Sequence, residues 1–280
     1  MTHQDPEQQA GDHPANDPLS HLVAEIAEVA EYLWQKGWAE RNSGNISVRV
    51  NGLIREAFPS GSISSATPLS EPFLRMAGDL YLVTGTGCRM RDVSREPDKN
   101  LLMIRITAEG DGYEILSPPE TKSGPVVPTS ELISHLMIHR YLKEHQPTKR
   151  AIVHTHPSEL IALSHSPVYK EESLLNRILW GMLPETTILV PEGLGVIPYR
   201  ITGSSELAYA SVNALQSHSV LLWEKHGCLA VAPTVMEAFD LIDVMVKSAD
   251  ILLKCLHAGF SPEGLTDEQI EELRDRFHRK

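Results

Sequence analysis

The sequence lacks most of the features that mark secreted or membrane-embedded proteins. Its three cysteines, Cys88, Cys228 and Cys255, form no C-x-x-C pair, so they predict neither a disulfide framework nor a cysteine zinc site. No apolar run reaches the length of a membrane span, and the first residues do not form a signal peptide. We therefore expect a cytoplasmic protein with no membrane partner.

Positive charge and the common nucleotide motifs are also scarce. The formal net charge of −12 argues against nucleic acid as a partner, although it leaves room for a local phosphate site. The chain has no G-x-x-x-x-G-K and no G-x-G-x-x-G, which makes a nucleotide an unfavoured ligand. It also lacks the G-x-S-x-G of serine hydrolases.

What is present is typical of one globular domain. The chain has 280 residues, of which 41% are apolar and 22% charged. Residues 1–17 are polar and proline-containing, which predicts a disordered tail, and residues 18–280 are expected to fold as one domain. Helical and strand patterns alternate along that domain. They favour an α/β fold in which helix layers cover a mixed sheet.

The pattern of apolar residues and turn signals gives approximate element bounds. A helix is expected from Pro18, capped by Asp17, and capping boxes at Thr234 and Thr266 begin two further helices. Other helices are predicted over 131–144, 157–164, 171–181 and 205–217. Strands are predicted over 46–50, 79–83, 100–108, 112–116, 151–156, 186–190 and 220–224, the last continuing at 229–231.

Two histidines on the predicted strand 151–156 suggest a metal site. Successive side chains of a strand alternate between faces, so His154 and His156 point the same way, with Cβ atoms roughly 6–7 Å apart. His226, directly before Gly227, is the best candidate for a third ligand. Three imidazoles with an open position are typical of catalytic zinc, and Mn²⁺, Co²⁺ or Fe²⁺ also suit such a site.

His135 and His139 form a rival pair. Their i, i+4 spacing on one helix also suits zinc, but Leu136 stands where the H-E-x-x-H motif has its glutamate. Glu131, at the start of the same helix, is the candidate acid/base. The alternative is that Glu131 only interacts favourably with the helix dipole, which is worth about 0.3–1 kcal/mol.

Three loops are rich in small hydrogen-bond donors. They are 42–45 (Asn-Ser-Gly-Asn), 84–87 (Thr-Gly-Thr-Gly) and 129–130 (Thr-Ser). Each alone reads as a turn. Together with a helix N-terminus they would form an anion cradle, which favours a small phosphorylated substrate.

These motifs, in this order and spacing, resemble the class II aldolase/adducin family over about residues 19–260. The resemblance implies a three-layer α/β/α sandwich with a central mixed, largely antiparallel sheet. It implies one Zn²⁺ per subunit, bound by His154, His156 and His226, and a homotetramer with sites at subunit interfaces. The activity it implies is reversible cleavage of a phosphorylated ketose to dihydroxyacetone phosphate and a small aldehyde, through a metal-stabilised enediolate.

The resemblance also assigns roles to individual residues. Glu131 matches the family's catalytic glutamate beside the metal, and Glu185 matches an acidic residue that reaches a neighbouring subunit's site. Cys88 stands where the family has a basic residue, and Arg89 or Arg91 would be its substitute near the phosphate. The positions that match the substrate and phosphate site are Asn42, Gly44, Asn45, Thr86, Gly87, Thr129 and Ser130.

Two other functions remain open on the sequence. The same metal site suits an epimerase or dehydratase acting on another phosphorylated sugar. A non-enzymatic interaction module of the adducin type is the second alternative, although the complete histidine set argues against it.

Overall fold

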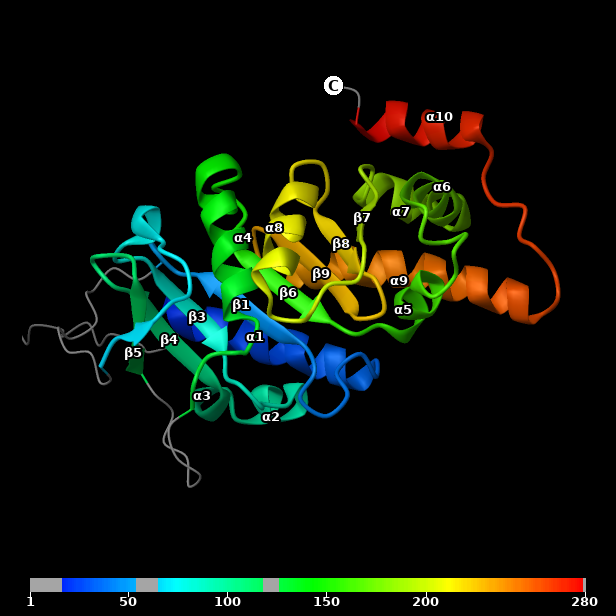
Figure 1. Cartoon of the computed structure of the whole chain (residues 1–280). Coiled ribbons are helices and arrows are strands. Elements are labelled where there is room, and N and C mark those ends of the chain that lie inside the picture. Colours follow the sequence, from blue (N-terminus) through cyan, green and yellow to red (C-terminus); the bar gives the residue numbers. More distant parts are fainter. Residues whose placement is uncertain (1–16, 54–64, 118–125, 279–280) are drawn as a thin grey trace, which may run out of the picture.

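The computed structural model describes residues 17–53, 65–117 and 126–278, which leaves the predicted tail outside the described residues except for Asp17. Within this part of the chain, nine strands form one sheet (Figure 1). The strands are β1 (Asn45–Arg49), β2 (Thr67–Pro68), β3 (Leu80–Thr84), β4 (Leu101–Ile106), β5 (Gly112–Ser117), β6 (Ala151–Thr155), β7 (Leu194–Ile197), β8 (Val220–Trp223) and β9 (Gly227–Ala232).

The sheet order places β6 in the interior of the sheet, beside the central strand β1. The strands run β2-β5-β4-β3-β1-β6-β9-β8-β7, and every pair is antiparallel except β7 with β8. The expected mixed, largely antiparallel sheet is therefore confirmed. Because β6 lies between β1 and β9, side chains at its end are flanked by two other strands.

Helices cover both faces of this sheet, as the three-layer expectation requires (Figure 1). On one face α1 (Pro18–Gln35), α5 (Ser158–Ser164), α6 (Glu172–Met182) and α9 (Val235–His257) pack on side chains such as Val153. On the other face lie α4 (Leu132–His145) and α8 (Ser205–Ala214), over side chains such as Ile152. The remaining helices are α2 (Met90–Arg95), α3 (Pro97–Asn100), η2 (Leu74–Met76), α7 (Pro184–Leu189) and α10 (Asp267–His278).

Local signals begin several helices where the sequence predicts them. The Asp17 side chain accepts hydrogen bonds from the backbone N–H groups of Leu19 and Ser20, and Pro18 occupies the first turn of α1. Thr234 and Glu237 form a reciprocal capping box at α9. Thr266 and Gln269 exchange the same two bonds before α10.

The predictions between residues 183 and 231 need three corrections. The predicted strand 186–190 belongs to the helix α7. Its β-branched Thr186 and Thr187 are buried, and they hydrogen bond to Ser248 of α9 and to the carbonyl of Trp180 of α6, respectively. The strand that the sequence suggested there lies later, at β7. Residues 229–231 do not continue β8, because a turn reverses the chain and β9 pairs antiparallel with β8.

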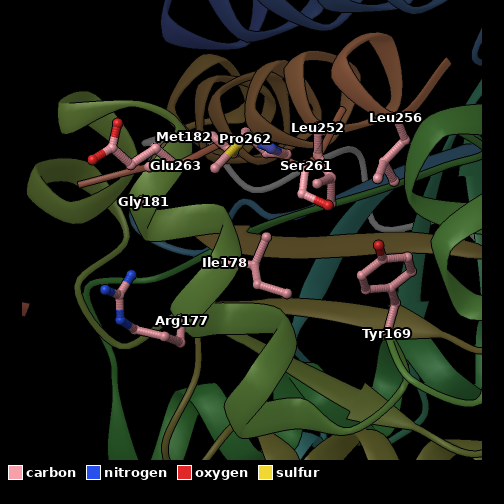
Figure 2. A pocket seen from close by; sticks show the side chains of 11 residues that line it. Tyr169, Arg177, Ile178, Gly181, Met182, Leu252, Leu256, Ser261, Pro262 and Glu263 are labelled. Carbon is pink, nitrogen blue, oxygen red and sulfur yellow. The ribbon is translucent and has the colours of Figure 1, made fainter. Parts of the chain in front are cut away.

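A cavity of about 390 Å³ lies away from the centre of the sheet. It is lined by Ile178 and Met182 of α6, by Leu252 and Leu256 of α9, and by the chain leading to α10 (Figure 2). Its lining is mostly apolar. Next to it, Arg177 holds the chain before α10 by donating to the carbonyl of Leu265 at 3.0 Å.

No helix in the described ranges is both long enough and apolar enough to cross a membrane.

Candidate metal centre

Three histidines meet beyond the ends of β6 and β8. His154 is near the end of β6 and His156 follows that strand, so strand alternation turns both toward the face that carries α4. His226 lies in the turn between β8 and β9, where Lys225 adopts a left-handed backbone conformation with φ of 62°. Among the described residues, one ring nitrogen from each histidine lies within 4.8 Å of the other two.

The hydrogen bonds of two of these rings fix which nitrogen faces the centre. Nδ1 of His154 donates to the backbone carbonyl of Cys228 at 2.9 Å, and Nδ1 of His156 donates to a carboxylate oxygen of Glu40 at 3.0 Å. In neutral rings both Nε2 atoms are then bare, and they lie 3.2 Å apart. Two ligands of a tetrahedral zinc ion, bonded at about 2.0–2.1 Å, lie roughly 3.3 Å apart.

This arrangement fits a cation. Two facing lone pairs repel one another, and a metal ion between them removes the repulsion. A histidine ligand whose second nitrogen donates to a carbonyl or a carboxylate is the usual arrangement at protein metal sites. The sequence-based expectation of a metal site at His154, His156 and His226 is thus supported by the positions of their donor atoms.

The protonation states suit metal binding as well. Burial, together with the nearby rings of His156 and His226, lowers the pKa of His154 well below its ordinary value. Burial also lowers the pKa of His226, although the Glu131 carboxylate opposes that shift. Neutral imidazoles bind metals, so both side chains keep their lone pairs available at neutral pH.

Glu131 faces the three histidines from the start of α4. Its Oε2 lies 3.4 Å from Nε2 of His154, and its Oε1 lies 3.5 Å from Nε2 of His226. The residue is buried and makes no capping hydrogen bond to the helix, so its side chain is not occupied by the helix terminus. Asn45 donates to Oε2 at 2.8 Å. A carboxylate beside a metal centre is well placed for proton transfer.

The three donor loops surround the same point. A cavity of about 280 Å³ is lined by Glu131, by the three histidines, and by all seven positions predicted for substrate and phosphate, namely Asn42, Gly44, Asn45, Thr86, Gly87, Thr129 and Ser130. Backbone hydrogen bonds hold two of the loops together, from Thr86 N to Val127 O at 2.7 Å and from Thr129 N to Thr84 O at 3.0 Å.

Gly44 shows why glycine is needed in the first loop. Its φ is +81°, and a Cβ atom there would lie 3.0 Å from the carbonyl oxygen of His154. A side chain would therefore strain the backbone and push against β6.

Some residues of the site were not predicted, and two predicted substitutes do not reach it. Thr202, from the loop between β7 and α8, lines the cavity, and Glu40 supports His156 from outside it. None of the described residues that line the cavity is a lysine or an arginine, so Arg89 and Arg91 do not line it, and their role near the phosphate stays a prediction. A Thr or a Glu in a loop carries no sequence signal that separates it from ordinary surface residues.

Glu185 and the rival histidine pair lie elsewhere. Glu185 is exposed in the first turn of α7 and does not line the cavity of its own chain, so its role across a subunit interface stays a prediction. His135 and His139 are buried behind Glu131, and both hydrogen bond to Ser47 rather than joining the metal group.

Comparisons with known proteins identify the family of the sequence. The family model described as Class II Aldolase and Adducin N-terminal domain matches residues 24–253. The rhamnulose-1-phosphate aldolase of Bacteroides thetaiotaomicron is 42% identical over 268 residues, which is 93% of this chain and 95% of that protein. The rhamnulose-1-phosphate aldolase of Escherichia fergusonii is 34% identical, covering 94% of this chain and 95% of that protein.

A solved structure shows the same fold. The sugar-phosphate aldolase from Thermotoga maritima superposes with a TM-score of 0.74 at 35% sequence identity, over 88% of this chain and 99% of that one. The three-layer architecture, the histidine group beside a buried glutamate and the match over most of the sequence lead to one conclusion. The chain is a member of the class II aldolase and adducin family.

Proposed function

We propose that the protein is a zinc-dependent aldolase that reversibly cleaves L-rhamnulose 1-phosphate to dihydroxyacetone phosphate and L-lactaldehyde. The observation that carries this proposal is the single cavity that holds Glu131, the three histidines and all three donor loops. The substrate is suggested by the names of the relatives that match over nearly the whole chain.

The metal and Glu131 divide the chemistry between them. When bound by His154, His156 and His226, a divalent cation supplies the Lewis acidity that stabilises an enediolate. In cleavage, Glu131 accepts the proton of the C4 hydroxyl as the aldehyde forms, while the C3–C4 bond breaks and its electron pair remains on C3. Glu131 then gives that proton to C3, and in the condensation direction the same carboxylate removes a proton from C3.

The donor loops suit the phosphate group. Thr129 and Ser130 precede the 14-residue helix α4, so backbone N–H groups and the positive end of the helix dipole face that side of the cavity. The backbone of Gly87 has a positive φ, which turns the Thr86–Gly87 loop tightly at the cavity wall. Among the described residues, the donors that these loops present to the phosphate are neutral.

The assembly and the location are part of the same proposal. We infer a homotetramer in which Glu185 of a neighbouring subunit contributes an acidic group to each site, and a cytoplasmic location. The exposure of Glu185 on the short helix α7 supports this role, because the side chain is free to meet another subunit. Zinc is the proposed metal, and Mn²⁺, Co²⁺ and Fe²⁺ are the alternatives to be compared.

The direct test is a coupled assay of L-rhamnulose 1-phosphate cleavage, with and without a chelator. We expect cleavage to stop when the metal is removed and to return when zinc is added back. Full activity in protein shown to be free of metal would overturn the metal mechanism. A panel of other sugar phosphates, analysed for epimerised and dehydrated products, separates the aldolase from the two alternative reactions.

Glu131→Gln tests the proton transfer. The amide keeps the shape and the hydrogen-bond acceptor but cannot move a proton, so we expect kcat to fall by about 10²- to 10⁴-fold with metal content unchanged. Glu206→Gln is the control, because Glu206 is another glutamate at a helix N-terminus, in the first turn of α8, and does not line the cavity. If the two variants lose equal activity, Glu131 is only a helix-terminus charge.

A further inference from the structure

A row of buried polar side chains leads away from Glu131, beginning with Asn45 in the cavity wall and continuing behind it. Asn45 and Ser47 are two residues apart on β1 and share a face of the sheet, while His135 and His139 are one turn apart on α4. Each is at most 7% exposed. The function proposed above does not use Ser47, His135 or His139. Burying four polar side chains in one place costs free energy unless they are hydrogen bonded.

The four side chains form one continuous hydrogen-bonded chain that ends on Glu131. Asn45 Nδ2 lies 2.8 Å from Glu131 Oε2, and Asn45 Oδ1 is hydrogen bonded to Nε2 of His135. Nδ1 of His135 lies 2.6 Å from Ser47 Oγ, which lies 2.8 Å from Nε2 of His139.

The direction of each bond follows from the first one. A carboxylate only accepts, so the Asn45 amide turns its N–H group toward Glu131 and its carbonyl toward His135. His135 Nε2 must then donate. A neutral imidazole has one donor and one acceptor, so His135 Nδ1 accepts from the Ser47 hydroxyl, and Ser47 in turn accepts from His139 Nε2–H.

Two observations support neutral rings with these tautomers. Burial lowers the pKa of His135 to about 4 and lowers the pKa of His139 well below its ordinary value. Nδ1 of His139 is buried without a hydrogen-bond partner, as the bare end of such a chain would be. The ring of His139 packs against Tyr81, with centroids 4.8 Å apart, which closes the end of the chain with an aromatic ring.

We propose that His135, Ser47 and His139 are positioning residues, which hold the Asn45 amide with its N–H group toward Glu131 and thereby keep the carboxylate aimed at the reacting carbon. This role rests on the proposed aldolase function. Without the His135 donor, the amide is free to rotate by half a turn and present its oxygen to Glu131. Two acceptors would then face each other, and the carboxylate would turn away from the substrate.

The test compares His135→Leu with His135→Gln in metal-loaded protein. Leu removes the donor to Asn45, whereas the amide nitrogen of Gln reaches about the place of Nε2 and restores it. We expect His135→Leu to lower kcat about tenfold or more, with KM for L-rhamnulose 1-phosphate within about twofold of wild type. His135→Gln should recover most of the lost turnover. A purely structural role predicts equal losses in both, and that result would overturn the proposal.

A second measurement does not depend on activity or on the stability of these variants. Long-range ¹H–¹⁵N spectra of the wild-type protein at neutral pH should show His135 and His139 as neutral rings protonated on Nε2. A proton on Nδ1 of His135 would refute the proposed chain even if the enzyme is an aldolase. Conversely, absence of cleavage by the wild type with the expected tautomers present would refute the proposed function alone.

Ser47→Ala gives a milder perturbation with a matched control. Its loss leaves His135 without a partner at Nδ1, so we expect a smaller fall in kcat and a mixture of His135 tautomers. Ser248 is equally buried and hydrogen bonds to Thr186 on the other side of the sheet, so Ser248→Ala should leave kcat and the His135 spectrum unchanged. Equal effects of the two alanine variants would contradict the proposal.

Discussion

Gly227 has no side chain, which lets the metal histidines His154 and His156 pack closely against it. Its replacement by alanine gives the sharpest test of the centre. A Cβ atom at this position would lie 2.6 Å from the carbonyl oxygen of Thr155, 2.8 Å from Cδ2 of His156 and 2.9 Å from Cε1 of His154. Ordinary contacts begin at 3.4 Å, so these atoms must retreat by about 0.5 to 0.8 Å.

The two imidazoles are the parts that can move. The Thr155 carbonyl belongs to β6, and Thr155 is paired with Cys228 of β9, so this carbonyl resists displacement. A zinc site tolerates changes in ligand distance of about 0.2 Å, which is less than the required shift. We therefore expect Gly227→Ala to weaken metal binding by about 10- to 100-fold and to lower the free energy of unfolding by about 1–3 kcal/mol.

The assay is competition with a chelator of known affinity, at a temperature where circular dichroism shows each variant folded. Gly195→Ala is the matched control, because a Cβ atom there would also be crowded, 3.0 to 3.2 Å from the side chains of His218, Leu221 and Ala214, none of which lines the metal cavity. It should lose stability and keep its metal affinity. Metal affinity of Gly227→Ala within threefold of wild type would refute the packing argument.

Two further predictions concern protonation and support of the centre. In metal-free protein, an unfolded His135 takes up a proton below its ordinary pKa of 6.5, whereas burial keeps the folded side chain neutral down to about 4. The free energy of unfolding is therefore unaffected by His135 titration above pH 6.5. It falls as pH drops from 6.5 toward 4, by about 1.4 kcal/mol per pH unit and ~3 kcal/mol in all, because only the unfolded state takes up the proton in that range. Urea unfolding of wild type and His135→Gln between pH 7.5 and 4.5 measures this, and equal pH slopes would contradict it. Glu40→Ala removes the acceptor that holds His156 and should weaken metal binding about tenfold, whereas Glu40→Gln keeps an acceptor oxygen and should bind nearly as wild type. Chelator competition distinguishes the two, and equal losses would show that charge matters rather than orientation.

The metal site was predictable because its signals are local. A strand has a side-chain period of two, so His154 and His156 had to share a face once residues 151–155 formed β6. His226 could be placed because the strand before it and the glycine after it marked a turn. The loops could be listed from their composition, but that they line one cavity with Glu131 depends on strand order, which the sequence pattern does not contain.

The errors arose where tertiary packing decided the structure. Thr186, Thr187 and Ile188 have the β-branched composition of a strand, but Pro184 and Glu185 are typical of a helix start, and packing against α6 and α9 favours the helix. The hydrogen-bonded row behind Glu131 was not predicted either. Its members come from β1 and α4, about 90 residues apart, and only their meeting in the fold shows that His135 and His139 serve hydrogen bonding and not metal binding.

The two supports of the histidine tautomers differ in how readily they can change. The acceptor for His154 is the main-chain carbonyl of Cys228, which every amino acid provides, so no substitution at position 228 that preserves the pairing of β6 with β9 can remove it. The acceptor for His156 is an exposed side chain that one substitution can replace. One ligand is therefore set by the fold itself, while metal affinity remains adjustable at Glu40, on the solvent side of the site.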